Sequence, residues 1–275
     1  MDAVRLKNLS YVPETYTNEA GPQLLRDINL AIRTGEWVAL LGLNGSGKST
    51  LAGAIAGRLK KGITGERELG WLQDGFVPIV MQQPDAGIIG GTAWEDVVLL
   101  LEQFGAPQEE IIPRAERALM QLGLGAVMKE PVHTLSGGQK QLAAIAGCLA
   151  VDASLLLLDE VTSMLDTEAS DYVLRRVREL HEAGTTVIWV TQKTEELLSD
   201  DRVIVLADGV IRYDGMAGML FRESGSSGYE WLVNQLGLTA PFAAQAAWEL
   251  QKRGIELEPF PFTPQQLLKA VKRYG

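Results

Sequence analysis

The sequence predicts an α/β fold with a mixed sheet, a helical subdomain inserted into it and a small helical extension at the C-terminal end. Three observations lead to this prediction. Short apolar runs recur along the chain with helical segments between them, a spacing typical of parallel strands that are covered on both faces. Residues 87–150 show helical patterning and no convincing strand. A Ser/Gly-rich joint at residues 224–228 then precedes a segment of different composition.

The expected strands of the main domain are short. Residues 6–11 and 25–32 show partial alternation of apolar and polar residues, with a loop containing Pro, Gly and Asn between them. Uniformly apolar runs follow at residues 36–41, 76–81, 155–158 and 187–190. Residues 167–180, which separate the last two runs, predict a helix because their apolar residues share one helical face.

A hairpin and the extension complete the expected organisation. Residues 202–206 and 210–213 flank an Asp-Gly pair and predict a β-hairpin with a tight turn. We therefore expect a main domain over residues 1–223 and an extension over residues 229–275. The extension contains three candidate helices. The last opens at residues 263–266 with a threonine cap, a first-turn proline and a glutamine placed to satisfy free amides.

The composition limits the classes of partner. A chain of 275 residues is long enough for one large α/β domain and a small appendage. The formal charge of −10 argues against nucleic acid or an anionic lipid surface as the main partner. No apolar run approaches the roughly 18 residues that cross a bilayer, so we expect a soluble protein. If it works at a membrane, another chain must supply the span.

The sulfur and imidazole groups predict structural roles. Cys148 is the one cysteine and lies in an apolar segment, so we expect a buried small hydrophobe in a protein from a reducing compartment. His133 and His181 stand alone and form no metal-ligand pattern.

A glycine-rich turn carries the most specific motif in the sequence. Residues 42–50 read G-L-N-G-S-G-K-S-T, between an apolar run and a helical segment, and match the phosphate-binding loop. The glycines let backbone N–H groups approach a phosphate at a helix N-terminus, so a purely structural turn is the weaker interpretation. Lys48 would reach the β- and γ-phosphates, and Ser49 would ligate Mg²⁺. The residues expected to bind the nucleotide here are Asn44, Gly45, Ser46, Gly47, Lys48, Ser49 and Thr50.

Two acidic residues end the apolar run at residues 155–158. Asp159 would lie at the tip of a buried strand, where a carboxylate can hold the water shell of Mg²⁺. Glu160 follows it and could polarise an attacking water. Acids often end strands in α/β proteins, so this pair becomes specific only together with Lys48.

A second glycine turn suggests that the chain works in pairs. Ser136, Gly137, Gly138 and Gln139 directly precede the helical run at residues 140–150, so their turn forms another helix N-terminus suited to an anion. One ATP site does not need two such termini. The economical hypothesis is that this turn closes on an ATP held by a second subunit.

Together these motifs resemble the ABC ATPases, a family of P-loop NTPases, over about residues 4–215. The resemblance implies two subunits that meet head to tail and trap ATP and Mg²⁺ between a phosphate loop and the opposite Leu135–Gln139 signature. It also makes Gln82 a sensor of Mg²⁺ and the γ-phosphate, and it places Asp166 in the D-loop. An aromatic residue would stack on adenine, and the sequence leaves Tyr11 and Tyr16 as alternatives.

More narrowly, the chain is similar to the ATPase subunits of energy-coupling-factor (ECF) vitamin and metal importers. The matching residues are 83–85, 138–141, 159–166 and the C-terminal extension. This similarity implies a second ABC ATPase subunit, an integral-membrane coupling subunit and a substrate-binding membrane subunit as partners. It implies a peripheral position at the cytoplasmic face of the cell membrane. We expect residues 92–104 to contact the membrane subunit and the extension to strengthen dimerisation.

One position departs from the family pattern. Gln192 stands where the family has a histidine that contacts the γ-phosphate. A glutamine can donate a hydrogen bond but cannot become cationic near neutral pH. We therefore expect slow turnover at this chain's own site and favour a heterodimer with a histidine-bearing partner over a homodimer.

Two alternatives to the importer ATPase follow from the same residues. A soluble ABC protein of translation or DNA repair would usually carry two cassettes or a long coiled coil, and neither is present in this sequence. A regulatory ATP-binding module is disfavoured by Glu160 and favoured by Gln192.

Overall fold

A six-stranded mixed sheet forms the centre of the protein. The computed structural model describes residues 1–14, 21–70, 77–82, 88–224 and 230–274. In this sheet the strands lie in the order β5-β6-β7-β3-β8-β9, and only β9 runs antiparallel to its neighbour. Their bounds are β3 Trp37–Leu41, β5 Ile79–Val80, β6 Leu155–Asp159, β7 Thr186–Val190, β8 Arg202–Ala207 and β9 Val210–Met216. Every residue of β3, β6 and β7 is buried, as expected for strands covered on both faces.

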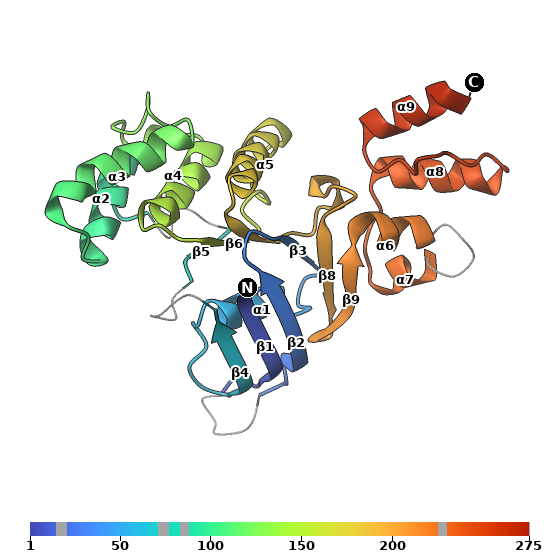
Figure 1. The fold of residues 1–275 in the computed structure, drawn as a ribbon, viewed down its shortest axis with the longest axis horizontal. Helices are drawn as coiled ribbons and strands as arrows, with labels where there is room; N and C mark the ends of the chain where they lie inside the picture. Colours follow the sequence, from blue (N-terminus) through green and yellow to red (C-terminus); the bar gives the residue numbers. More distant parts are fainter. Residues whose placement is uncertain (15–20, 71–76, 83–87, 225–229, 275) are drawn as a thin grey trace.

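A second, antiparallel sheet packs beneath the first (Figure 1) and consists of three strands in the order β2-β1-β4. Strands β1 (Asp2–Tyr11) and β2 (Leu25–Arg33) contain the two N-terminal strands predicted from the sequence. Strand β4 (Ile63–Leu69) was not predicted, because its charged, mostly exposed residues give no apolar alternation. It is held by pairing with β1, and the Lys7 ammonium lies 2.6 Å from a Glu68 carboxylate oxygen across that pair.

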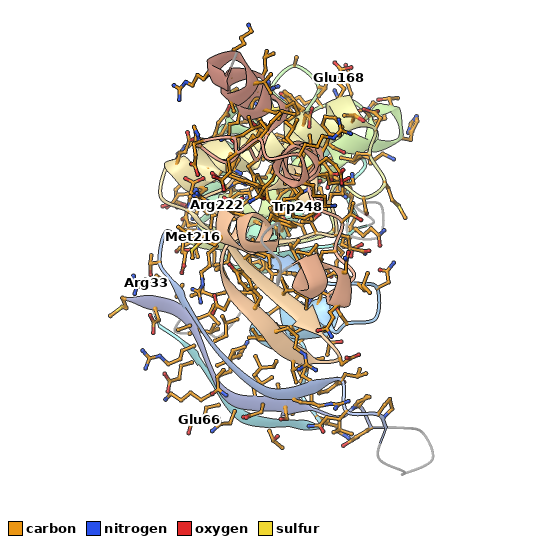
Figure 2. The ribbon with its side chains drawn as sticks, turned by 90° about the vertical axis from the view of Figure 1, so that its right-hand side faces the viewer. Arg33, Glu66, Glu168, Met216, Arg222 and Trp248 are labelled. Carbon is orange, nitrogen blue, oxygen red and sulfur yellow. The ribbon has the colours of Figure 1, made fainter. Side chains whose placement is uncertain are left out.

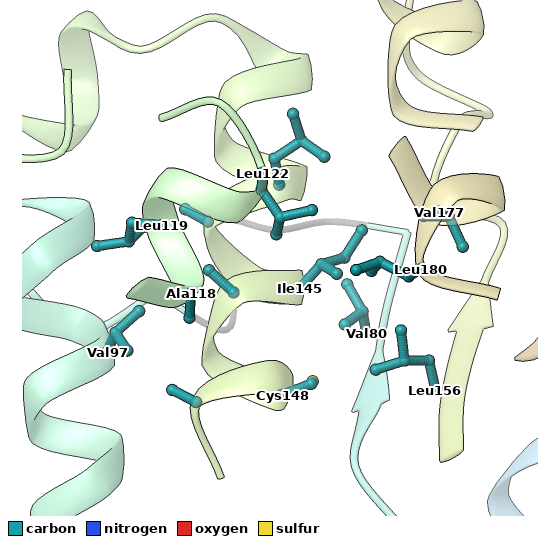
Figure 3. Packing of buried hydrophobic residues seen from close by; sticks show 14 of the residues in the cluster. Val80, Val97, Ala118, Leu119, Leu122, Ile145, Cys148, Leu156, Val177 and Leu180 are labelled. Carbon is teal, nitrogen blue, oxygen red and sulfur yellow. The ribbon is translucent and has the colours of Figure 1, made fainter. Parts of the chain in front are cut away.

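The inserted helical subdomain has its own core. It contains α2 (Ala93–Gln103), α3 (Gln108–Gln121) and α4 (Gly137–Ala150), which gather on one side of the molecule in Figure 1. Figure 3 shows their apolar side chains meeting those of β5, β6 and α5 (Thr167–Glu182). Cys148 lies in this core, and burial raises the pKa of its thiol to about 12, which confirms the predicted inert role.

One predicted strand is shorter than its apolar run. Of residues 76–81, only Ile79 and Val80 pair with β6, and residue 76 lies outside the described part of the chain. Pro78 directly precedes the paired residues and has no N–H to donate to a ladder.

Three of the four C-terminal helices pack against one face of the main sheet, and the last one packs on the helix before it. The three predicted helices are present as α7 (Glu230–Gln235), α8 (Phe242–Lys252) and α9 (Pro264–Tyr274), and a further helix, α6 (Ala217–Ser224), precedes them. Buried side chains of α6, α7 and α8 form one cluster with those of β3 and β8, including Leu41, Val205, Phe221 and Trp248, and Phe262 before α9 joins it. The buried Ala270 of α9 instead packs in a small separate cluster with Ala247 and Leu257. In Figure 2 Trp248 lies at this junction, where its indole N–H donates to the Phe221 carbonyl at 2.9 Å.

The cap predicted for the last helix is formed. The amide of Gln266 donates to the Thr263 hydroxyl at 3.3 Å, and the Thr263 amide donates to the Gln266 side chain at 3.1 Å. Across the described residues, no helix combines the length and the apolar character needed to cross a membrane.

Phe221 of α6 packs between the sheet and the extension, which predicts that Phe221→Ala destabilises the whole domain. Phe221 is fully buried, so its truncation should lower the free energy of unfolding by about 3–5 kcal/mol. Phe242→Ala is the matched control, because Phe242 is 67% exposed. Urea unfolding of both variants measures the difference. Equal stability of the two variants would contradict the packing described above.

Candidate nucleotide-binding site

The turn at residues 42–47 joins β3 to α1 (Lys48–Ile55) and depends on two glycines. A Cβ at Gly42 would lie 2.3 Å from the Leu206 carbonyl oxygen, so the close approach of the two backbones requires glycine. Gly47 has a φ of 105° and caps α1 in the left-handed region. The turn therefore presents the N-terminus of α1 at the end of a buried strand.

Lys48 is buried with its ammonium group folded back over the turn. The ammonium donates to the carbonyls of Gly42 at 2.8 Å and Leu43 at 3.1 Å. It also lies 3.5 Å from a carboxylate oxygen of Glu160. These acceptors partly compensate the buried positive charge, and an anion entering the turn would replace them.

Asp159 provides the opposite charge at the tip of β6. Burial raises the pKa of this carboxyl group, although the Ser49 hydroxyl donates a hydrogen bond to it. Among the described residues, none donates a hydrogen bond to Asp159 Oδ1, which is buried. A buried carboxylate oxygen without a partner, beside a hydroxyl, is a donor set that suits a hard divalent cation.

Gln192 connects three loops of the site. Its side-chain nitrogen donates to Asn44 Oδ1 at 2.7 Å and to Glu160 Oε1 at 2.8 Å. Glu160 has a φ of 52°, a left-handed conformation that costs a non-glycine residue free energy and occurs often at functional sites. Its backbone N–H donates to the Val190 carbonyl at 3.0 Å, which ties the turn to the end of β7.

These groups surround a pocket of about 360 Å³. Its lining brings together most of the residues predicted from the two motifs and adds Leu24 and Met81, which no motif indicated: Leu24, Asn44, Gly45, Gly47, Lys48, Ser49, Thr50, Met81, Gln82, Asp159 and Glu160. Ser46 instead turns its hydroxyl into the protein, where it finds no partner within the described part of the chain.

Gln82 links this pocket to the helical subdomain. It lies on the pocket wall, and its backbone carbonyl accepts a hydrogen bond of 3.0 Å from the side chain of Gln141 on α4. Gln141 is almost completely buried. A movement of α4 would therefore displace the segment that carries Gln82.

The second glycine turn lies away from the pocket. The Ser136 hydroxyl accepts from the Gln139 amide at 3.2 Å, and the Gln139 side chain accepts from the Ser136 amide at 2.8 Å, so the two residues form a capping box on α4. Ser136, Gly138 and Gln139 line a different pocket, together with Asp166. Asp166 itself caps α5 through the Ala169 amide at 2.8 Å. Within one chain, these residues do not line the pocket that contains Lys48.

The two candidate adenine-stacking tyrosines differ in what can be described. Tyr11 ends β1, is half-buried, packs against the core and is not among the described residues that line the pocket of Lys48. Tyr16 lies outside the described residues.

Glu196 was not predicted from the sequence, although its hydrogen bonds hold two of the loops that form the site. This buried carboxylate accepts hydrogen bonds from Trp189 Nε1 at 2.8 Å, the Thr191 hydroxyl at 2.7 Å and the Thr162 hydroxyl at 2.5 Å. It thereby joins the residue before Gln192 to the turn that follows Glu160. No local pattern marks it, because an acid in a short polar segment is normally exposed.

Comparison with known proteins agrees with these motifs. A family model described as ABC transporter matches residues 25–163. The energy-coupling factor transporter ATP-binding protein EcfA1 of Halalkalibacterium halodurans is 36% identical, over 98% of this chain and 96% of that protein. The corresponding EcfA of Methanosarcina acetivorans is 38% identical, over 92% of this chain and 91% of that protein.

Solved structures give the same result. The fold resembles cbiO1 from Clostridium perfringens, described as part of the ABC transporter complex cbiONQ, with a TM-score of 0.69 at 26% identity, over 86% of this chain and 99% of that one. It also resembles the dimeric cassette MJ0796 bound to ADP and Pi, with a TM-score of 0.64 at 30% identity, over 78% of this chain and 98% of that one. The chain therefore belongs to the ABC transporter family, among the energy-coupling factor ATP-binding proteins.

Proposed function

We propose that this chain binds ATP and, paired with a second ATPase subunit, hydrolyses it to energise a membrane importer of the energy-coupling-factor type. The observation that carries this proposal is the convergence of Lys48, Asp159 and Glu160 on one pocket at the ends of β3 and β6. Phosphoryl transfer to water requires a cationic side chain, a carboxylate that can hold Mg²⁺ and a second carboxylate that can polarise the water. These are the groups of Lys48, Asp159 and Glu160, in that order.

The phosphate loop would hold the phosphates of ATP. Asn44, Gly45, Gly47 and Thr50 line the pocket next to the N-terminus of α1, where N–H groups and the helix dipole favour anions. Lys48 would exchange its two loop carbonyls for phosphate oxygens. Both partners are then better satisfied, because the new hydrogen bonds join opposite charges.

Ser49, Asp159 and Gln82 would hold Mg²⁺. Ser49 and Asp159 already contact one another, and Asp159 Oδ1 lacks a donor among the described residues. When bound, the ion would supply positive charge that offsets the charge developing on the phosphate oxygens. Gln82 could report the occupancy of the site to α4 through its hydrogen bond with Gln141.

Glu160 would polarise the attacking water, and Gln192 would orient Glu160. In the structure the Gln192 amide donates both of its hydrogens, one to Glu160 and one to Asn44. To contact a γ-phosphate, it must break one of these bonds. This supports slow turnover at this chain's own site and a heterodimer with a more active partner. A weakly catalytic, regulatory subunit is the second candidate, and Gln192 is the observation that favours it.

A seam between two chains would complete the site. Ser136, Gly137, Gly138 and Gln139 form a capped helix terminus that lies apart from the chain's own phosphate loop, which suits a contact with ATP on the opposite subunit. Asp166 would lie in the same seam. The dimeric relative that carries ADP and Pi supports this arrangement.

Membrane partners would bind the helical subdomain. Leu99 and Phe104 are about half exposed on and just after α2, and they would contact an integral-membrane coupling subunit that itself binds a substrate-binding membrane subunit. Closure of the ATPase pair would pass to this surface through Gln82 and α4. The chain would sit peripherally at the cytoplasmic face of the cell membrane.

The exposed Phe242 and Leu268 of the extension support its role in dimerisation.

Glu160→Gln tests the hydrolytic role. We expect ATP to bind with near-normal affinity and turnover to fall by about 100-fold or more, because the amide cannot accept a proton from water. The measurements are phosphate release and binding of a fluorescent ATP analogue. Glu109→Gln on the exposed face of α3 is the control. A Glu160→Gln protein that hydrolyses ATP at the wild-type rate would remove Glu160 from the mechanism.

Gln192→His tests the departure from the family pattern. We expect the ATPase rate of the assembled complex to rise on the order of tenfold and to acquire a pH dependence near 6.5, where an imidazole titrates. Rates between pH 5.5 and 8.5 would show this, with Gln108→His on the surface as control. An unchanged rate and pH profile would contradict the slow-site hypothesis.

Asp159→Asn tests whether the buried Asp159 carboxylate lowers the stability of the folded protein when no ligand is added. The pKa of Asp159 is raised in the folded protein, so the folded state binds more protons than the unfolded state between the ordinary value of 3.8 and the raised value. Wild-type stability therefore falls as pH rises through that window. We expect the variant to be more stable than wild type at neutral pH without ligands, and the difference to shrink at low pH.

The matched control for this charge removal is Asp171→Asn on the exposed face of α5. Urea unfolding at several pH values, with and without Mg²⁺ and ATP, gives the comparison. A ligand-free Asp159→Asn protein less stable than wild type at neutral pH, or one that Mg²⁺ and ATP still stabilise fully, would refute this account.

A further inference from the structure

The turn that follows α7 touches the phosphate loop. Gly237 and Leu238 close this helix with hydrogen bonds from their amides to the carbonyls of Asn234 and Val233, a Schellman motif that fixes the turn. Gly237 has a φ of +64°, and a Cβ there would lie 2.5 Å from Leu43 Cδ1. The side chain of Leu43 therefore rests on the bare backbone of Gly237.

Leu43 also belongs to the machinery that holds Lys48. Its backbone carbonyl accepts hydrogen bonds from the Lys48 ammonium and the Ser46 amide, each at 3.1 Å. The side chain that packs on Gly237 and the carbonyl that binds Lys48 thus belong to the same residue.

The same turn touches the loop that carries Gln192. The Thr194 hydroxyl donates to the Thr239 carbonyl at 2.6 Å, and Thr194 is almost completely buried. Thr194 opens the short 3₁₀ segment Thr194–Glu196, two residues after Gln192. Glu196 in that segment accepts a hydrogen bond from the Thr191 hydroxyl. The residues before and after Gln192 are therefore joined to one another, and Thr194 joins them to the extension.

Two loops that meet inside the site therefore rest on one external turn. Asn44 and Gln192 join these loops at 2.7 Å, and residues 237–239 contact both of them from the extension. We propose that this turn positions the phosphate loop and the Gln192 loop relative to one another, so that the C-terminal extension sets ATP affinity and turnover. The proposal rests on the ATPase function proposed above and adds a role beyond dimerisation.

The positioning role has a direct consequence for assembly. A partner that binds the extension binds the same segment that contains residues 237–239, and these residues contact Leu43 and Thr194 directly. Binding there can therefore change the site without touching the nucleotide.

A matched pair of glycine variants tests the contact with Leu43. Gly237→Ala and Gly254→Ala both place a side chain at positive φ in the extension, at +64° and +80°, but a Cβ at Gly254 meets nothing within 4 Å. We expect similar losses of thermal stability in both variants. Only Gly237→Ala should raise the KM for ATP, by about tenfold, because a small misplacement of binding groups is costly.

A second pair tests the contact with Thr194 and does not depend on glycine geometry. Thr194→Val removes the hydroxyl that binds Thr239, whereas Thr186→Val removes a buried hydroxyl that accepts a 3.0 Å hydrogen bond from the Gly35 amide at the opposite end of β7. We expect kcat to change only in Thr194→Val, with comparable melting temperatures in the two variants.

The outcomes separate this proposal from the proposed function. A wild-type chain that neither binds nor hydrolyses ATP refutes the ATPase function itself. If wild type is active and each variant has the same KM and kcat as its matched control, the positioning role is wrong. Altered kinetics confined to Gly237→Ala and Thr194→Val support it. If Gly237→Ala does not fold, the valine pair alone decides.

Discussion

One side-chain amide holds the site together. The nitrogen of Gln192 binds Glu160 and Asn44, and these residues follow β6 and β3, the strands on either side of β7. The spacing of Glu160 from the turn at residues 42–47 therefore depends on the end of β7, which Glu196 fixes in turn. A parallel sheet makes this possible, because the carboxyl ends of neighbouring strands meet at one edge. A glutamine in this position holds these groups together without adding a charge.

The site contains a buried positive group and a buried negative group, so it suits a ligand that itself has both negative and positive charges. Among the residues that the structure describes, Lys48 contacts loop carbonyls and Glu160, and Asp159 is buried with one oxygen that finds no donor there. Each group alone would raise the free energy of the folded state. In the proposed function, ATP with a divalent cation would supply partners for both groups, and its binding would stabilise the folded protein.

The features that could be predicted from the sequence depend on residues close together in the chain. The features that could not be predicted depend on contacts between residues far apart in the chain. The phosphate loop, the helix N-terminus at Ser136 and the cap of the last helix at Thr263 follow from residue types within a few positions, so they could be predicted. The same is true of the uniformly apolar strands. Strand β4 escaped prediction because partner pairing, not apolar patterning, holds it. Glu196, and the contact of Gly237 with Leu43, join residues far apart in the sequence, which no local pattern encodes.

The sequestered thiol has a practical consequence for optical and magnetic-resonance work. Because Cys148 is the single cysteine and is closed off in the core of the helical subdomain, maleimide dyes and nitroxide labels will react with a newly introduced surface cysteine in preference to the native one. Distances between labelled subunits can therefore be recorded on a protein whose native residues are otherwise left unchanged.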